Sequence, residues 1–337
     1  MSKRIRRAVA TLFFGGLAAT HVAALAGFVL GSWPLGIAAD GLYLLALFDG
    51  ALGLGLLARA GSRRAGAWAL MAGIGCGALT WGPGAALSPD PNWGWRGMFE
   101  ARAAKETGSS VFKARVLQAN VEALGVRPAA IEGLEFDVAA IAEWQPGDDQ
   151  SWARERGLEL VSFDPARSDV ALFSRWPALE QGCMADASGR CQAQWARLDT
   201  PGGPIRVASL HTLSPQKGWR SQSRDEFMER FAREVGAWPA GEPALAAGDF
   251  NATWATRSMR DFAAQGSWNG GARLRPTWPT FAARWGVGFR IDHVLASRGA
   301  RVTNHRTFDS GYSDHLWSMA DVEITVAAPA GADGRRR

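Results

Sequence analysis

The sequence predicts an α/β domain with mixed sheets, preceded by three apolar helices. Residues 1–88 are rich in Ala, Gly and Leu, with charges confined to short patches, whereas charged residues occur throughout the rest of the chain. In the second part, strand-like runs alternate with helical ones and include hairpins, which favours mixed sheets over a purely parallel sheet. A length of 337 residues allows two domains. We expect a membrane domain at 1–88, a linker at 89–110, a catalytic domain at 111–327 and a disordered basic tail at 328–337.

Three apolar stretches lie in the first part of the chain: Ala8–Gly31, Leu35–Leu57 and Ala65–Leu87. Each reaches the roughly 20 residues that a helix needs to cross a bilayer. The first is longer than the apolar region of a cleaved signal peptide, and two more follow it. We therefore expect three transmembrane helices. The alternative, a buried helical hairpin of a soluble protein, would not need three such runs.

Basic residues predict the orientation of these spans. They precede the first span and lie between the second and third, at Lys3, Arg4, Arg6, Arg7, Arg59, Arg63 and Arg64. The positive-inside rule then places the N-terminus in the cytoplasm and residues 89–337 on the far side. In a bacterium, this describes a multi-pass protein of the inner membrane with a periplasmic or extracellular second domain.

Ionisable residues also occur inside the predicted spans. Asp40 and Asp49 lie in the second and His21 in the first. Such groups are costly in a bilayer and require a partner. If the first two spans form an antiparallel hairpin, His21 and Asp49 reach a similar depth, so we hypothesise a hydrogen bond between them. The alternative is separate pairing with backbone groups or water.

Two of the three cysteines lie close together in the second domain. Cys183 and Cys191 flank a turn that contains Asp, Ser and Gly, whereas Cys76 lies in the third apolar stretch. In an oxidising compartment this spacing suits a disulfide across a hairpin. The alternative is two free thiols on a surface loop.

The second domain contains enough strand and helix patterns for two stacked sheets with helices outside. Alternation and continuous apolar runs predict strands at Lys113–Gln118, Asp137–Ala142, Asp169–Ser174, Gln194–Thr200, Pro204–Leu210, Pro243–Ala247, Arg290–Ala296, Val302–Phe308 and Trp317–Val326. Helical patterns occupy Arg127–Leu134, Ser221–Trp238 and Arg257–Gln265. The sequence has no Gly-rich nucleotide loop and no Cys/His zinc spacing, so we expect no nucleotide cofactor.

Polar groups accompany six of these strand runs. They lie in Gln118-Ala119-Asn120, Ala142-Glu143-Trp144, Ser209-Leu210-His211-Thr212, Gly248-Asp249-Phe250-Asn251, Ile291-Asp292-His293 and Ser313-Asp314-His315. Taken as strand ends, these segments converge at one rim of a sandwich. Their carboxylates, amides and imidazoles suit a hard divalent cation and a phosphate group. The net charge of +5 is modest, which argues against a dedicated binder of duplex DNA.

Hydrolysis of a phosphate ester assigns a role to each residue type. Charge on the phosphoryl oxygens must be neutralised, a water must lose a proton, and the leaving oxygen must be stabilised. Glu143 closes an apolar strand, where an unpaired carboxylate is costly, so we predict that it binds a metal ion. Asp249 can take a proton from water or hold that water near the metal, and Asn251 can donate a hydrogen bond to a phosphoryl oxygen.

The two histidines of these segments complete the predicted site. We expect Asp292 to orient His315, which leaves Asp314 free for the metal. His211 contacts the phosphate or protonates the leaving group. Trp254 is predicted to contact the substrate from a loop beside the site.

These motifs, in this order, resemble the endonuclease/exonuclease/phosphatase superfamily. Gly248-Asp249-Phe250-Asn251, Ile291-Asp292-His293 and Ser313-Asp314-His315 carry the resemblance, which covers roughly residues 112–326. It implies a four-layered α/β sandwich, with two mixed sheets flanked by helices, and dependence on Mg²⁺ or Mn²⁺. It places Asn120 and Glu143 in the early metal-site positions and His211 in the position of the phosphate-contacting His. Asp249 and Asn251 take the positions of the catalytic Asp and the phosphate-binding Asn, and the closing Asp and the Asp-His pair correspond to Asp292, Asp314 and His315.

The resemblance is strongest to bacterial members that carry membrane anchors. Arg275-Pro276-Thr277-Trp278-Pro279, followed by Arg290-Ile291-Asp292-His293, resembles that subgroup. Ala142 replaces the usual Gln before the metal-binding Glu, and Trp317 replaces a usual Pro. The substrate could be a phospholipid headgroup or a nucleic acid. The alternative function is a binding or scaffold protein on an inactive hydrolase fold; the sequence does not indicate an oligomeric state.

Overall fold

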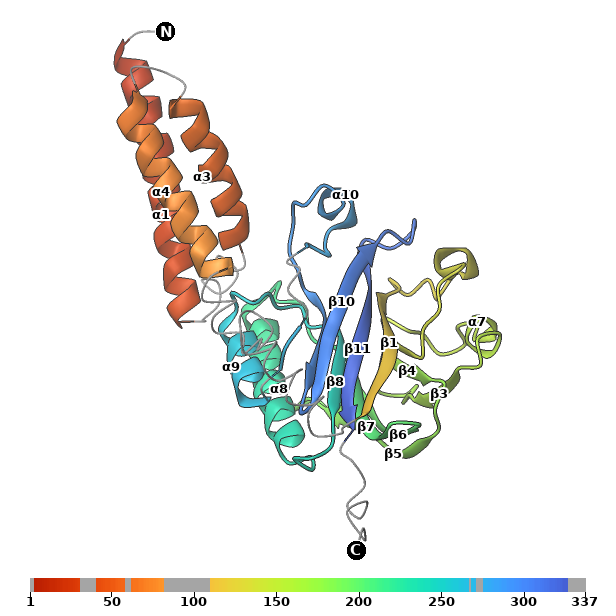
Figure 1. The fold of residues 1–337 in the computed structure, drawn as a ribbon. Helices are drawn as coiled ribbons and strands as arrows, with labels where there is room; N and C mark the ends of the chain where they lie inside the picture. Colours follow the sequence, from red (N-terminus) through yellow and green to blue (C-terminus); the bar gives the residue numbers. More distant parts are fainter. Residues whose placement is uncertain are drawn as a thin grey trace, which may run out of the picture.

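The computed structural model describes residues 3–30, 41–57, 62–81, 110–266, 268–270 and 275–326. It contains a three-helix bundle near the N-terminus and a sandwich of two β-sheets (Figure 1). The predicted linker up to residue 109, the tail at 328–337 and Asp40 lie outside the described residues.

The bundle consists of α1 (Lys3–Leu30), α3 (Leu42–Leu57) and α4 (Arg63–Trp81). Within the described ranges, none of the helices combines the length and the apolar character that crossing a membrane requires. The prediction of three transmembrane helices is therefore not supported. Helix α3 has 16 residues, fewer than the roughly 20 that span a bilayer, and α4 begins with two arginines.

The hypothesised contact between the first two helices is confirmed. His21 Nε2 of α1 lies 2.5 Å from Asp49 Oδ2 of α3, and Asp49 is fully buried. The three helices thus bring together ionisable side chains that lie far apart in the sequence.

Eleven strands of the described chain form two sheets. The six-stranded sheet has the order β10-β11-β1-β2-β4-β3 and the five-stranded sheet the order β5-β6-β7-β8-β9. The strands of the first sheet are β1 (Ser110–Asn120), β2 (Val138–Ala142), β3 (Glu159–Ser162), β4 (Val170–Ser174), β10 (Ala300–Phe308) and β11 (Trp317–Val326). Those of the second are β5 (Ala178–Ala185), β6 (Cys191–Thr200), β7 (Gly203–His211), β8 (Ala244–Asp249) and β9 (Asp292–Ser297).

Both sheets are mixed, as predicted. The pairs β1–β2 and β7–β8 are parallel, whereas their neighbours β11–β1 and β8–β9 are antiparallel. A parallel pair at the centre of each sheet directs the carboxyl ends of four strands to one rim. The antiparallel neighbours bring the beginnings of β9 and β11 to that same rim.

Three layers of apolar contacts hold the sandwich together. Between the sheets, Val116 and Leu172 of one pack with Val207 and Leu245 of the other. Outside the second sheet, α8 (Gly218–Gly236) and α9 (Arg257–Gly266) supply buried aromatic residues, including Phe231. Outside the first sheet, the 3₁₀ helix η2 (Pro128–Ile131) and α7 (Ser151–Arg154) cover a further apolar cluster. Helices therefore flank both sheets, which fits the predicted α/β class.

Some local predictions need correction. The helix predicted at Arg127–Leu134 is only the four-residue η2, because Glu132, with ψ of 133°, and Gly133, with φ of +67°, leave the helical conformation. Strands β3 and β5 and the short α10 (Thr280–Ala283) were not predicted.

Cys183 of β5 and Cys191 of β6 form a disulfide between these paired strands.

Candidate active site

Four of the predicted site residues come from strands that run toward one rim of the sandwich. Asn120 ends β1 and Glu143 follows β2, while His211 and Asp249 end β7 and β8. His211 and Asp249 are direct neighbours in the parallel pairing of those strands. The ends of both central parallel pairs thus contribute to one cluster of side chains.

The remaining residues reach the rim by a different route from the one predicted. Asp292 is the first residue of β9, and Asp314 and His315 precede β11, so none of them ends a strand. Because β9 is antiparallel to β8, Asp292 lies directly opposite Asp249. The antiparallel pairing of β11 with β1 similarly brings His315 to the rim.

Asp249 lies at the centre of the cluster. Its Oδ2 atom is 3.9 Å from His211 Nε2, 3.8 Å from His315 Nε2 and 3.2 Å from Asn120 Nδ2. The residue is 1% exposed. Burial, reinforced by the carboxylate of Asp292, raises the pKa of Asp249 to about 6. Asp249 can therefore accept a proton near neutral pH.

His315 is held by Asp292, as the sequence indicates. His315 Nδ1 lies 2.9 Å from Asp292 Oδ2, and Gln118 Nε2 donates to Asp292 Oδ1 at 2.7 Å. Burial alone would lower the pKa of His315, but the charge and hydrogen bond of Asp292 raise it to about 10. Burial would raise the pKa of Asp292, but the positive charge of His315 lowers it overall. The hydrogen bond at Nδ1 directs Nε2 toward Asp249.

His211 has a matching carboxylate that sequence reasoning missed. Its Nδ1 atom lies 2.9 Å from Asp169 Oδ2, which also accepts a 2.6 Å hydrogen bond from Arg190. Burial opposes charge on both groups, but their mutual attraction raises the pKa of His211 and lowers that of Asp169 to about 2. Asp169 precedes β4. A second histidine in the site also needs a carboxylate to orient its ring, and this need could have pointed to Asp169.

Glu143 has the most exposed side chain among the carboxylates next to the two histidines, apart from Asp314. Its backbone is in the left-handed region, with φ of +59°. Its Oε1 atom accepts a 3.0 Å hydrogen bond from Asn120 Nδ2 and lies 3.8 Å from His211 Nε2. The oxygen of the Asn120 amide accepts from the backbone N–H of Glu122. As placed, Asn120 thus turns its nitrogen toward Glu143 and Asp249, so it positions the predicted metal-binding carboxylate.

Asn251 is placed by the turn that follows β8. Its backbone N–H donates to Asp249 Oδ1 at 2.8 Å, and its Nδ2 donates to the carbonyl of Thr212 at 2.9 Å. The buried Arg224 donates to the carbonyl of Asn251. Gly248 permits this turn, because its φ is +150° and an added Cβ would lie 2.0 Å from the carbonyl oxygen of Leu210.

Asp314 lies at the outer edge of the site, with its side chain about half exposed. Its Oδ1 atom is 3.7 Å from His315 Nε2, and its Oδ2 accepts a 2.9 Å hydrogen bond from Trp278 Nε1. Its backbone carbonyl accepts from the N–H of Thr280. Asp314 therefore links the site to the segment that contains α10.

The predicted contact of Trp254 with substrate stays a prediction, and the side chain is buried instead of lying on an exposed loop. Trp254 is 8% exposed and belongs to the apolar cluster beneath α8 and α9, where its ring packs edge-on against His293. His293 Nε2 is bonded to the carbonyl of Ala252, and burial lowers the pKa of His293 to about 3. This pair of rings is structural, because apolar neighbours occupy its surroundings.

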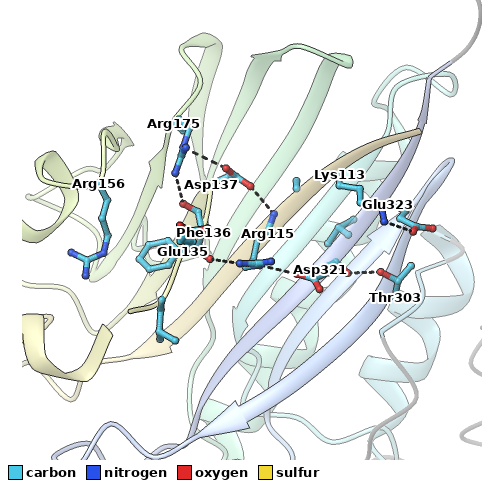
Figure 2. A pocket seen from close by; sticks show the side chains of 13 residues that line it. Lys113, Arg115, Glu135, Phe136, Asp137, Arg156, Arg175, Thr303, Asp321 and Glu323 are labelled. Carbon is cyan, nitrogen blue, oxygen red and sulfur yellow. Dashed lines mark hydrogen bonds and ion pairs between the residues drawn. The ribbon is translucent and has the colours of Figure 1, made fainter. Parts of the chain in front are cut away.

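A separate hollow of about 620 Å³ lies at the opposite end of β1 (Figure 2). It is lined by charged residues, but these pair with one another. Arg115 bonds Asp321 at 2.8 Å, and Arg175 lies 3.4 Å from Asp137. None of the residues assigned to the candidate site lines this hollow.

Replacing Asp169 with Asn should destabilise the protein in a pH-dependent manner. The pKa of Asp169 in the folded protein, about 2, lies below its ordinary value of 3.8. Its charge therefore contributes about 2 kcal/mol above pH 4, and this contribution is lost as the pH falls toward 2. Urea unfolding followed by tryptophan fluorescence should show a difference near 2 kcal/mol at pH 7 that narrows at pH 3.

The matched control is Asp164→Asn, which breaks an exposed ion pair with Arg167 and should change the free energy of unfolding little. If Asp169→Asn costs the same at pH 3 as at pH 7, the charge of Asp169 is not the stabilising feature.

Comparisons with known proteins are consistent with this geometry. The model of the Endonuclease/Exonuclease/phosphatase family matches residues 113–315, which include every residue assigned to the candidate site. No curated protein matches the chain.

Solved structures share the fold at low sequence identity. A humanized TDP2 of D. rerio with 14 mutations is 15% identical, with a TM-score of 0.52 over 62% of this chain and 98% of its own. Two proteins described as endonuclease/exonuclease/phosphatase are each 16% identical. The one from Bacteroides vulgatus has a TM-score of 0.51 over 63% of this chain and 99% of its own. The one from Bacteroides thetaiotaomicron has a TM-score of 0.50, with coverages of 64% and 97%. By its sequence match and its fold, this chain belongs to the endonuclease/exonuclease/phosphatase family.

Proposed function

We propose that this protein is a divalent-metal-dependent phosphoesterase that hydrolyses phosphodiesters. One observation carries the proposal: a buried carboxylate, Asp249, lies between two imidazoles whose Nδ1 atoms are each held by another carboxylate. This arrangement presents a base and two hydrogen-bond donors to a common reacting group. Family membership supports hydrolysis of phosphate esters.

The residues at the rim suit Mg²⁺ or Mn²⁺, because their donors are mainly carboxylate oxygens. Glu143 would hold the ion, with Asn120 positioning its carboxylate and Asp314 available at the outer edge. When bound, the ion would neutralise charge on the phosphoryl oxygens.

The side chains of this chain then account for the proton transfers. Asp249 accepts a proton from the attacking water as the bond from water oxygen to phosphorus forms. The bond from phosphorus to the leaving oxygen breaks, and that oxygen takes the Nε2 proton of the His211 imidazolium. His315 and Asn251 donate hydrogen bonds to the phosphoryl oxygens, which favours the charge that builds up there.

The full-length protein should hydrolyse bis-p-nitrophenyl phosphate when Mg²⁺ or Mn²⁺ is added and should lose this activity with a chelator. Asp249→Asn should lower kcat at least ~100-fold, because the variant cannot accept the water's proton. Glu143→Gln should raise the metal concentration needed for half-maximal rate. Release of p-nitrophenolate measures the wild-type activity, the kcat of Asp249→Asn and the metal dependence of Glu143→Gln.

Asp321→Asn is the matched control, since Asp321 lines the separate hollow at the other end of β1, and it should retain the activity. Absence of turnover across a broad panel of metals and diesters would instead support the alternative of a scaffold on an inactive hydrolase fold.

For the substrate, we favour a phospholipid headgroup over a nucleic acid. The segment joined to Asp314 exposes large apolar side chains: Phe281 is 70% exposed, Trp285 80% and Val287 43%. Helix α10 of this segment projects from the sandwich (Figure 1). Aromatic side chains that project beside a hydrolytic site suit the interface of a lipid layer.

The double replacement Phe281→Ala and Trp285→Ala should separate interfacial from soluble substrates. We expect about a 10-fold loss of hydrolysis on phosphatidylcholine vesicles, because less apolar surface enters the lipid layer. Turnover of bis-p-nitrophenyl phosphate should be unchanged. Leu179→Ala, an exposed apolar residue on β5, is the control. Cleavage of single-stranded DNA or plasmid without cleavage of lipid would favour the nucleic-acid alternative.

We also propose that the catalytic domain lies outside the cytoplasm, because its Cys183–Cys191 disulfide suits an oxidising compartment. Alkylation of thiols in intact cells, followed by non-reducing mass analysis, should leave both cysteines unalkylated. A membrane-impermeant protease added to spheroplasts should digest the catalytic domain while a cytoplasmic marker stays intact. Two alkylated cysteines or a protected domain would contradict this location.

A further inference from the structure

The helix bundle contains a second cluster of chemically reactive side chains, away from the catalytic residues. It forms where α3 and α4 pack closely. A Cβ added to Gly73 of α4 would lie 2.9 Å from the backbone nitrogen of Gly50 and 3.1 Å from Asp49 Cβ. The absence of a side chain at Gly73 therefore lets the helices approach and brings Cys76, one turn later, next to Asp49.

The geometry of His21 requires a proton between its ring and the carboxylate of Asp49. Its Nδ1 atom lies 2.7 Å from the carbonyl oxygen of Leu17, which can only accept a hydrogen bond, so Nδ1 carries a proton. The Nε2 atom faces Asp49 Oδ2 at 2.5 Å. If Nε2 carried a lone pair, it would repel the carboxylate at this distance. A proton must therefore lie between the two groups, and a metal cation could replace it only after the two atoms had moved apart, because each ligand atom lies about 2 Å from a bound Zn²⁺.

The His21–Asp49 pair has further potential metal ligands around it that a shared proton would not use. Asp49 is fully buried, and its Oδ1 atom has no hydrogen-bond partner among the residues that the structure describes. Cys76 is 4% exposed. One ligand atom each from His21, Asp49 and Cys76 can be chosen so that all three lie within 4.8 Å of one another. A buried carboxylate oxygen without a partner is costly, and a cation would remove that cost.

We propose that His21, Asp49 and Cys76 form a binding site for a divalent transition-metal cation such as Zn²⁺. An imidazole nitrogen, a carboxylate oxygen and a thiolate sulfur are ligands that Zn²⁺ accepts, and three protein ligands leave a fourth position open. The sulfur ligand disfavours Mg²⁺, which prefers oxygen. The carbonyl of Leu17 fixes the ring of His21 in the way that outer partners of metal-bound histidines commonly do.

Cobalt substitution tests this site in the full-length protein. The chain has three cysteines, and two of them form the disulfide, so Cys76 is the cysteine that can supply a thiolate ligand. After treatment with chelator, one equivalent of Co²⁺ should produce the intense near-ultraviolet absorption of a thiolate–Co²⁺ bond, and Zn²⁺ should displace it. Cys76→Ser should abolish this absorption. His21→Gln should weaken Co²⁺ binding at least ~10-fold.

Asp249→Asn is the matched control, because it should keep the thiolate absorption while losing hydrolysis of the diester. Absence of the absorption in folded wild-type protein at several equivalents of Co²⁺ would overturn the proposal and leave a buried hydrogen bond between His21 and Asp49. Absorption that persists in Cys76→Ser would overturn it as well. The spectrum of the wild-type protein decides the question even if a variant does not fold.

Discussion

The candidate active site depends on the compensation of buried negative charge. Asp249 and Asp292 are 1% and 0% exposed and lie opposite each other across two neighbouring strands. Two carboxylates in such positions repel each other and lose their hydration. His315, between them, supplies a positive charge that lowers the pKa of Asp292, whereas burial and the carboxylate of Asp292 raise the pKa of Asp249 to about 6. Asp292 thus keeps its negative charge beside His315, whereas Asp249 remains available as a base.

The architecture makes this compensation possible because the site uses both sheets. Asp249 and Asp292 come from the five-stranded sheet, whereas Gln118 and Asn120 come from β1 of the other. Gln118 crosses the interior to bond Asp292, and Asn120 reaches Asp249. A shift of one sheet against the other would break these hydrogen bonds together. The apolar layer between the sheets therefore fixes the relative positions of the acid and base groups.

Most of the site could be predicted from the sequence because its residues follow short, recognisable segments. The pairing of Asp292 with His315 follows from local chemistry, and the pairing of His21 with Asp49 from equal depth in a hairpin. Asp169 was not assigned, because His211 lies 42 positions away and the fold brings the two side chains together, although the need of His211 for an orienting carboxylate pointed to such a residue. The burial of Trp254 could not be predicted, because a loop position does not reveal burial. The four-residue β3 and the largely unburied β5 carry weak apolar patterns, and contacts across the sheet stabilise them.

The two histidine–carboxylate clusters share one geometry, but their neighbours would suit different cations. In each, the Nδ1 atom of a histidine is fixed by an oxygen and Nε2 is directed toward a carboxylate. At the rim of the sandwich, the neighbours are further carboxylates and amides, which favour a hard cation and a phosphate. In the helix bundle, the neighbour is the sulfur of Cys76, which favours a softer cation. The side chains next to each histidine–carboxylate pair, rather than the pair itself, would therefore determine which ion the cluster selects.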